Sequence, residues 1–201
     1  MKSKVLATAT EMFLNFGFKS VTMDDIAQKM CISKKTIYSH YCNKRKLVEE
    51  ATFGLFDTIC TGIDDINNAK FNPIEELYQI KKLMLASLND EKSSPIFQLE
   101  KYYPKIHKTL MERKFEVMQS CVSENLQRGI DEGYFRKDID ISLITRIYFK
   151  GVTGIKDPVI FPVETYEVAY VLENYLDYHV RGIATEKGVQ TLDQTKIKYN
   201  S

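Results

Sequence analysis

The apolar residues of this chain recur at intervals of three and four almost throughout, and the strict alternation typical of strands is scarce. Across residues 2–16 this spacing marks one buried helical stripe, made by Val5, Ala9, Met12, Phe13 and Phe16. Gly17 follows, and glycine is common just beyond the C-terminus of a helix. The pattern therefore predicts an all-α fold whose first helix spans residues 2–16.

Two short helices are predicted next, each preceded by a residue that can cap its N-terminus. Thr22 precedes a helix over about 23–30, and the acidic Asp25 three residues later resembles a capping box. A tight turn follows, and Ser33 can cap a second short helix over about 34–41. Two short helices joined in this way, behind a packing helix, form the helix-turn-helix arrangement.

The second short helix has an apolar face and a polar face. Ile37 and Tyr41 are four residues apart and are expected to pack inward. The outward face carries Lys34, Lys35, Tyr38 and Ser39. This is the helix that can enter a major groove, where phosphates and base edges accept hydrogen bonds from such side chains. The pattern therefore predicts a DNA-reading module.

The remainder of the chain is predicted to form longer amphipathic helices. One begins at Asn43 or Lys44 and reaches about residue 66; the others lie near 74–89, 94–103, 105–132, 140–155 and 163–184. The final stretch, KGVQTLDQTKIKYN over residues 187–200, is polar, so we expect it to fray.

The charge is unevenly distributed along the chain. Residues 1–50 hold 9 Lys and Arg against 5 Asp and Glu, whereas residues 51–201 hold 19 against 22. A basic N-terminal quarter on a slightly acidic body predicts a polyanionic partner.

The four cysteines show no C-x-x-C pair and no disulfide spacing, which favours free thiols in a reducing cytoplasm. The sequence contains no run of 18 apolar residues, so it predicts no transmembrane helix. We therefore expect a cytoplasmic protein.

The run TMDDIAQKMCISKKTIYSHYCNKRKLVEE, together with the preceding FLNFGFKSVT, resembles the DNA-binding signature of TetR-family transcriptional regulators over about residues 2–50. The resemblance implies a helix-turn-helix domain over residues 1–46 and a helical regulatory and dimerisation domain over residues 47–201. The sequence departs from the family at Cys31, where glycine is usual. If that position needs a positive φ, a residue other than glycine costs about 1 kcal/mol or more.

The resemblance also implies roles for individual residues. It implies phosphate contacts from Thr22, Thr36, Tyr38 and Lys44, and base or groove contacts from Lys34, Lys35 and Ser39, with His40 able to make either. Lys44 also lies at a predicted helix N-terminus, where backbone N–H groups favour an anion. The alternative is that residues 34–46 form only a solvated basic face.

A module this small touches too few bases to select one genomic site, so a two-fold dimer is expected. The last two long helices are the candidates for its interface. The residues predicted to form it are Ile144, Tyr148, Gly151, Val168, Leu172, Tyr175 and His179. The resemblance implies a four-helix interface of this kind, and the alternative is that these side chains form an internal core.

The middle helices are candidates for a ligand pocket because they combine aromatic side chains, sulfur and a few polar groups. The candidate residues are Phe97, Tyr103, His107, Met111, Phe115, Met118, Cys121 and Tyr148. A stripe of this composition is also typical of a plain core, and that alternative stays open.

Catalytic motifs such as G-x-S-x-G, H-E-x-x-H and the P-loop are absent from the sequence, so we expect no enzyme, cofactor or metal. The sequence therefore predicts a homodimeric transcriptional regulator that binds an inverted-repeat operator in double-stranded DNA. We expect a repressor that a small apolar or amphipathic ligand releases. The alternative is an architectural or partner-binding DNA-binding protein without ligand sensing.

Overall fold

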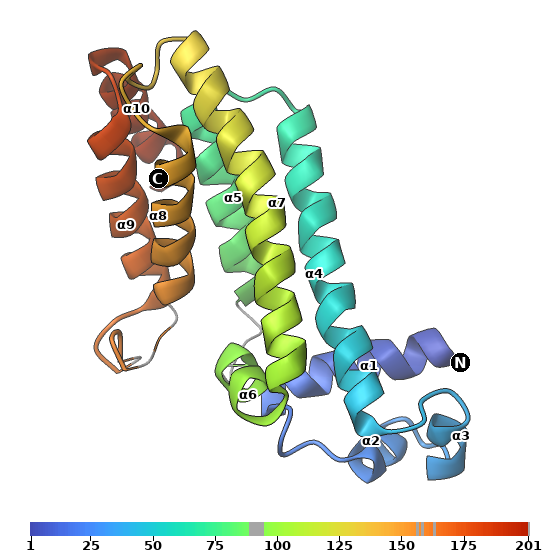
Figure 1. Cartoon of the computed structure of the whole chain (residues 1–201). Coiled ribbons are helices and arrows are strands. Elements are labelled where there is room, and N and C mark those ends of the chain that lie inside the picture. Colours follow the sequence, from blue (N-terminus) through green and yellow to red (C-terminus); the bar gives the residue numbers. More distant parts are fainter. Residues whose placement is uncertain (89–94, 156, 158, 163, 201) are drawn as a thin grey trace. The chain divides into compact units, whose positions relative to one another are not determined.

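A computed structural model of the chain describes residues 1–88, 95–155, 157, 159–162 and 164–200 (Figure 1). Its helices are α1 (Lys2–Phe16), α2 (Met23–Lys29), α3 (Lys34–Tyr38), α4 (Lys44–Asn68), α5 (Pro73–Leu88), α6 (Pro95–Tyr102), α7 (Pro104–Asp131), α8 (Ile141–Gly154), α9 (Val168–Ile183) and α10 (Glu186–Asn200). Within the described residues the β-structure is limited to one isolated antiparallel bridge between Phe135 and Ala184. The predicted all-α fold is confirmed. None of the helices in this part of the chain is long and apolar enough to cross a membrane.

The predicted helices agree with the observed ones to within a few residues at most ends. The predicted ends at residues 89, 94 and 163 lie outside the described part of the chain. The second short helix is shorter than predicted, because α3 ends at Tyr38 rather than near residue 41. Ser39 and His40 form a turn there, which leads directly towards α4.

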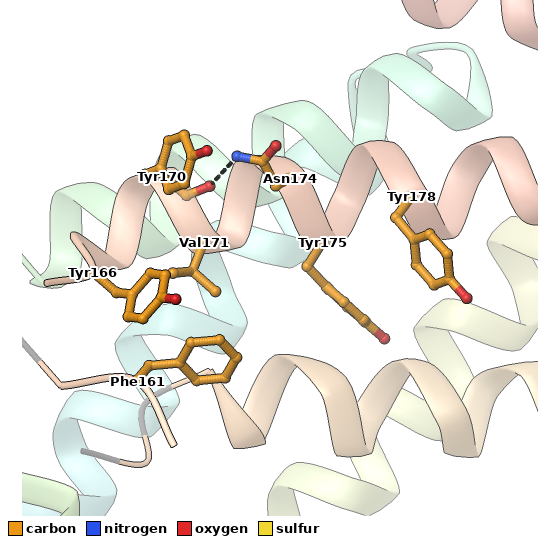
Figure 2. A pocket seen from close by; sticks show the side chains of 7 residues that line it. All are labelled: Phe161, Tyr166, Tyr170, Val171, Asn174, Tyr175 and Tyr178. Carbon is orange, nitrogen blue, oxygen red and sulfur yellow. Dashed lines mark hydrogen bonds between the residues drawn. The ribbon is translucent and has the colours of Figure 1, made fainter. Parts of the chain in front are cut away.

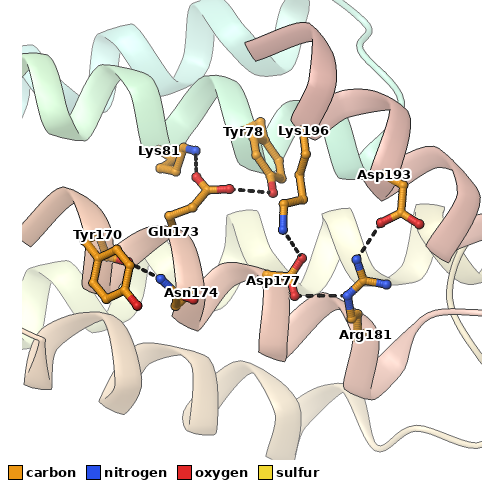
Figure 3. Close-up of polar contacts among 9 residues, drawn as sticks. All are labelled: Tyr78, Lys81, Tyr170, Glu173, Asn174, Asp177, Arg181, Asp193 and Lys196. Carbon is orange, nitrogen blue, oxygen red and sulfur yellow. Dashed lines mark hydrogen bonds and ion pairs between the residues drawn. The ribbon is translucent and has the colours of Figure 1, made fainter. Parts of the chain in front are cut away.

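The prediction that the C-terminal stretch frays is wrong, because α10 is a packed helix. Leu192 has no exposed surface and the side chain of Thr195 is buried. Two ion pairs hold its outer side against α9, from Arg181 to Asp193 and from Lys196 to Asp177 (Figure 3). Although the stretch is polar overall, it contains a few apolar residues at helical spacing. The helix is stable because α9 covers these residues.

The chain divides into two compact units. The first consists of Met1–Thr61 and Ala86–Arg113, and the second of Gly62–Leu85 and Lys114–Ser201. The first holds 14 Lys and Arg against 10 Asp and Glu, whereas the second holds 14 against 17. The positive charge therefore collects in the unit that contains the predicted DNA-reading module.

In the first unit, α1 packs on α2 and α2 packs on α3. Fully or almost fully buried side chains of this module are Val5, Ala9, Phe13, Ile26, Ile37, Tyr41 and Leu47. The prediction that Ile37 and Tyr41 face inward is therefore confirmed. Their burial fixes the rotation of α3 and so determines which of its side chains face outward.

In the second unit, α5, α7, α8, α9 and α10 surround one core. Its buried members are Ile74, Leu77, Tyr78, Val122, Leu126, Phe135, Tyr148, Leu176, Val180, Ile183, Ala184 and Leu192. One flank of α9 adds a polar layer to this core, where Glu173 accepts a hydrogen bond from Tyr78 and pairs with Lys81 (Figure 3). These polar contacts join α5 to α9. The opposite side of α9 carries exposed residues.

Candidate DNA-binding site

The N-terminus of α2 is held by a reciprocal cap. The Thr22 hydroxyl accepts a hydrogen bond from the Asp25 backbone N–H at 3.1 Å, and the Asp25 carboxylate accepts one from the Thr22 N–H at 2.7 Å. The Thr22 hydroxyl also donates to the Asp25 carboxylate, at 2.8 Å. The bond from the Thr22 N–H, followed by this hydroxyl bond, holds the pKa of Asp25 below its usual value. The predicted capping box is confirmed, and it fixes Thr22 at the edge of the module.

The turn between α2 and α3 contains a non-glycine residue in the left-handed region. Cys31 has a φ of 54°, so the position does need the positive φ that a family glycine would supply. Two backbone bonds close the turn, from the Cys31 N–H to the Gln28 carbonyl and from the Ile32 N–H to the Ala27 carbonyl. The arrangement is that of a Schellman-type helix end, which the chain forms here despite the strain on Cys31.

The N-terminus of α3 is also capped by a side chain. The Ser33 hydroxyl accepts a hydrogen bond from the Thr36 backbone N–H at 3.1 Å and lies 2.8 Å from the Thr36 hydroxyl. With Ile37 buried beneath it, α3 presents its polar side to solvent. Lys34, Lys35, Tyr38, Ser39 and His40 are exposed, and Thr36 is half-buried.

The exposed side chains on and just after α3 differ in whether they already form hydrogen bonds or ion pairs within the protein. Lys34 pairs with Asp24 of α2 at 2.8 Å, and this hydrogen bond raises the pKa of Lys34. The Ser39 hydroxyl donates to the Thr36 carbonyl of its own helix at 2.7 Å. The side chains of Lys35 and His40 make no hydrogen bond or ion pair within the described residues, so both can turn towards a ligand.

Lys44 is held beside the capped end of α2. Asn43 caps α4, its side-chain oxygen accepting from the Lys46 N–H at 2.9 Å, and Lys44 donates to the Lys19 carbonyl at 3.3 Å. Burial lowers the pKa of Lys44, and the charge of Asp25 opposes that shift. The fold thus brings two of the four predicted phosphate contacts, Thr22 and Lys44, to the same edge of the module.

The residues predicted for a dimer interface lie mostly inside the second unit. Tyr148, Leu172 and His179 are buried, and the Tyr148 ring lies 4.7 Å from His179 and 6.0 Å from Tyr175. Gly151 does allow a close approach, but the group beside it is the Tyr175 ring of the same chain. These side chains fill the contact between α8 and α9, which favours the alternative of an internal core for them.

The same two helices expose large apolar side chains on their other sides. Leu143 and Ile147 of α8 are 54% and 50% exposed, and Tyr170 and Tyr178 of α9 are 62% and 77% exposed. Sequence reasoning missed this face. Leu143 and Ile147 are four residues apart and Tyr170 and Tyr178 are eight apart, so each pair lies on one side of its helix. However, α9 is apolar on nearly every side, so its sequence does not indicate which side is exposed.

An open pocket of about 370 Å³ lies along this exposed side of α9 (Figure 2). It is lined by Phe161, Tyr166, Tyr170, Val171, Asn174, Tyr175 and Tyr178. None of the eight residues predicted for a ligand pocket is among them. Four of those eight, Phe97, Tyr103, His107 and Met111, belong to the first unit and the other four to the second. That ligand-pocket assignment stays a prediction.

Comparison with known proteins places the capped module in a family. Residues 5–51 match the model of the bacterial regulatory proteins of the tetR family. The N-terminal module of this chain belongs to the TetR family. It is 24% identical over 195 residues to the HTH-type transcriptional repressor KstR2 of Mycobacterium tuberculosis, covering 94% of each chain. It is also 34% identical over 80 residues to the biofilm operon regulator IcaR of Staphylococcus aureus, covering 39% of this chain and 42% of IcaR.

Solved structures of TetR-type regulators share the fold of this chain. The structure of KstR2 superimposes with a TM-score of 0.60 at 24% identity, over 92% of this chain and 95% of that one. A transcriptional regulator from Cytophaga hutchinsonii superimposes with a TM-score of 0.71 at 16% identity, over 91% and 98%. The fold that these structures share with this chain therefore extends beyond the 47 residues of the family match.

Proposed function

We propose that this chain is a cytoplasmic, homodimeric transcriptional repressor of the TetR family that binds an inverted-repeat DNA operator and leaves it when a small ligand binds. The exposed polar side of α3, held outward by the buried Ile37, is the observation that carries the proposal. The names of the relatives support a negative regulator, since KstR2 is a transcriptional repressor and IcaR a negative transcriptional regulator.

In the proposed complex α3 lies in the major groove. Lys35, whose ammonium has no partner in the described structure, would read guanine acceptors. Thr22, Thr36, Tyr38 and Lys44 would bind phosphates on either side and so fix the position of α3. Lys34, Ser39 and His40 would add groove contacts. Lys34 must first leave Asp24, an exposed pair that costs little to break.

The exposed apolar face of α8 and α9 supports a dimer. Leu143, Ile147, Tyr170 and Tyr178 would leave a large apolar surface in water if the chain stayed alone. A two-fold contact between two such faces would bury them and set two α3 helices at a fixed spacing. The pocket of Figure 2 adjoins Tyr170 and Tyr178, so a second copy would cover it as well.

The effector is proposed to be small and apolar or amphipathic. The solved structure of KstR2 is that of a ketosteroid transcriptional regulator, which sets a precedent for a ligand of this character. Release requires the ligand to favour a body conformation in which the spacing of the two α3 helices no longer fits the groove. The rival is a DNA-binding protein that senses no ligand.

Selection from a random DNA library at about 0.15 M salt, near physiological ionic strength, tests the DNA-binding part. We expect an enriched inverted repeat, which then serves to screen ligands for release. Binding without enrichment would favour the architectural rival.

Light scattering on purified protein tests the dimer. Ile147→Glu and Tyr178→Glu should give monomers, whereas Ile197→Glu, at a residue that is 71% exposed on α10, should stay dimeric. A monomeric wild type would contradict this part of the proposal.

A further inference from the structure

The loop between α1 and α2 is fixed to α6 within the first unit. Gly17, with a φ of 85°, lies so close to the Gln98 side chain that an added Cβ would clash with it. The Lys19 backbone N–H donates to the Gln98 side-chain oxygen at 3.2 Å, and the Phe18 ring meets the Tyr103 ring at 6.2 Å. The start of the DNA-binding module and α6 therefore hold a defined position relative to each other.

This contact gathers positive charge around one exposed tyrosine. The Lys19 and Lys101 ammonium groups lie 5.2 Å and 5.6 Å from the centroid of the Tyr102 ring, and Lys101 also lies 5.9 Å from the Phe97 ring. Tyr102 is 38% exposed, so its hydroxyl is available as a donor. In the described structure neither lysine pairs with an acidic group, and Glu100 of the same helix pairs with neither. Lys19, Lys101 and Tyr102 are called the α6 basic cluster below.

The α6 basic cluster is continuous with the phosphate-binding edge proposed above. Lys44 donates to the backbone carbonyl of Lys19, and Lys19 is three residues from Thr22. The positive charge of Arg45, next to Lys44, acts on Tyr103 and opposes the rise in its pKa that burial causes. Lys44, Lys19 and Lys101 thus connect the N-terminus of α4 to α6.

The geometry points to a second phosphate-binding surface: the α6 basic cluster contacts the DNA backbone alongside the helix-turn-helix. Two like charges near one ring repel each other, and a DNA phosphate placed near both would offset that repulsion. Lysine ammonium and tyrosine hydroxyl groups are both common phosphate donors, and neither reads sequence. The cluster therefore adds affinity for DNA of any sequence. This inference rests on the DNA-binding function proposed above.

The test measures binding of the full-length chain to two duplexes, one carrying the selected operator and one of scrambled sequence, over a series of salt concentrations. Lys19→Ala/Lys101→Ala should weaken binding to both duplexes and leave the preference between them unchanged. The slope of log K against log salt should become shallower by about 0.9 for each DNA phosphate that the variant no longer neutralises. Lys19→Arg/Lys101→Arg keeps both charges and should retain the wild-type slope. Lys82→Ala/Lys137→Ala removes the same charge from exposed sites of the second unit and serves as the matched control.

The outcomes separate this inference from the proposed function. A wild type without preference for the operator would overturn the proposed function, whatever the variants do. A wild type with that preference, and a Lys19→Ala/Lys101→Ala slope equal to that of Lys82→Ala/Lys137→Ala, would overturn the α6 surface alone. The α6 surface also fails if the double variant keeps its DNA affinity but no longer binds pyrophosphate, because the cluster would then hold a small phosphorylated molecule.

Discussion

The Tyr41 hydroxyl donates a hydrogen bond to the Glu50 carboxylate across 3.1 Å, and this bond ties the end of the α3 turn to α4. Lys2 of α1 binds the same carboxylate at 3.0 Å and lies 5.3 Å from the centroid of the Tyr41 ring. Burial, helped by Glu50, raises the pKa of Tyr41 to about 12, so the hydroxyl stays a donor at physiological pH. Three helical elements therefore meet at one polar contact directly behind the proposed DNA-reading surface.

Removing this hydroxyl should destabilise the module without emptying the core. Tyr41→Phe keeps the ring and loses one hydrogen bond to a carboxylate that still has Lys2, so we expect a loss of about 1 kcal/mol in the free energy of unfolding. Urea unfolding measures it. Tyr38→Phe removes a hydroxyl from an exposed side chain and should change stability by less than about 0.5 kcal/mol. Equal effects of the two substitutions would show that the Tyr41 bond contributes nothing.

Relieving the strain at Cys31 should stabilise the protein. A left-handed conformation costs a non-glycine residue about 1–2 kcal/mol, and Cys31→Gly removes that cost but makes the unfolded chain more flexible. We expect a net gain of up to about 1 kcal/mol in urea unfolding. Cys42 is also exposed and has no positive φ, so Cys42→Gly should lower stability. A loss of stability in both variants would mean that the turn carries no strain.

The module was predictable from the sequence because its determinants are local. The capping residues Thr22 and Ser33 predict where α2 and α3 begin. The positions of Ile37 and Tyr41 predict which side of α3 faces inward. The body was less predictable because its determinants are tertiary. Several sides of α9 are apolar, and only packing decides that Leu172 lies inside while Tyr178 stays outside. The Lys19 and Lys101 positions are 82 residues apart in the chain, so no local pattern brings them together.

Substitutions of a buried and an exposed residue of α10 test whether this helix is packed. Leu192 is fully buried in the core of the second unit, and Leu192→Ala leaves a cavity there, which should cost about 2–5 kcal/mol. Ile197 lies five residues later on the same helix and is 71% exposed, so Ile197→Ala should cost less than about 0.5 kcal/mol. Thermal or urea unfolding of both variants compares them. A frayed α10 would make the two substitutions equally harmless.

His179 should make the folded state sensitive to acid. Burial between the α8 and α9 side chains lowers its pKa to about 4, whereas the unfolded chain titrates near the ordinary 6.5. Between these values the unfolded state binds more protons, so stability falls as the pH drops, by about 1.4 kcal/mol per unit at the steepest. The neighbouring Tyr148 and Tyr175 have raised pKa values and stay neutral there.

Urea unfolding at pH 7 and pH 5 measures the effect of His179. The wild type should lose about 2 kcal/mol more than His179→Leu between these two values, because leucine cannot take up the proton. An identical loss in the two proteins would mean that His179 is already accessible to water when folded.

Substitutions at Lys35 and Lys44 should separate reading of sequence from binding of phosphate. Lys44→Ala removes a cation held at the N-terminus of α4, so binding should weaken on all DNA sequences and the salt slope should drop by about 1. Lys35→Ala removes the α3 ammonium that has no partner in the described structure, so preference should relax at one base position, at a cost of about 1–3 kcal/mol against the selected site. Repeating the library selection with each variant measures the sequence preference, and titration of the selected duplex at several salt concentrations measures the affinity and the salt slope. An unchanged preferred sequence with Lys35→Ala would remove Lys35 from the base-reading residues and leave Lys34, Ser39 and His40 as the candidates on the exposed side of this module.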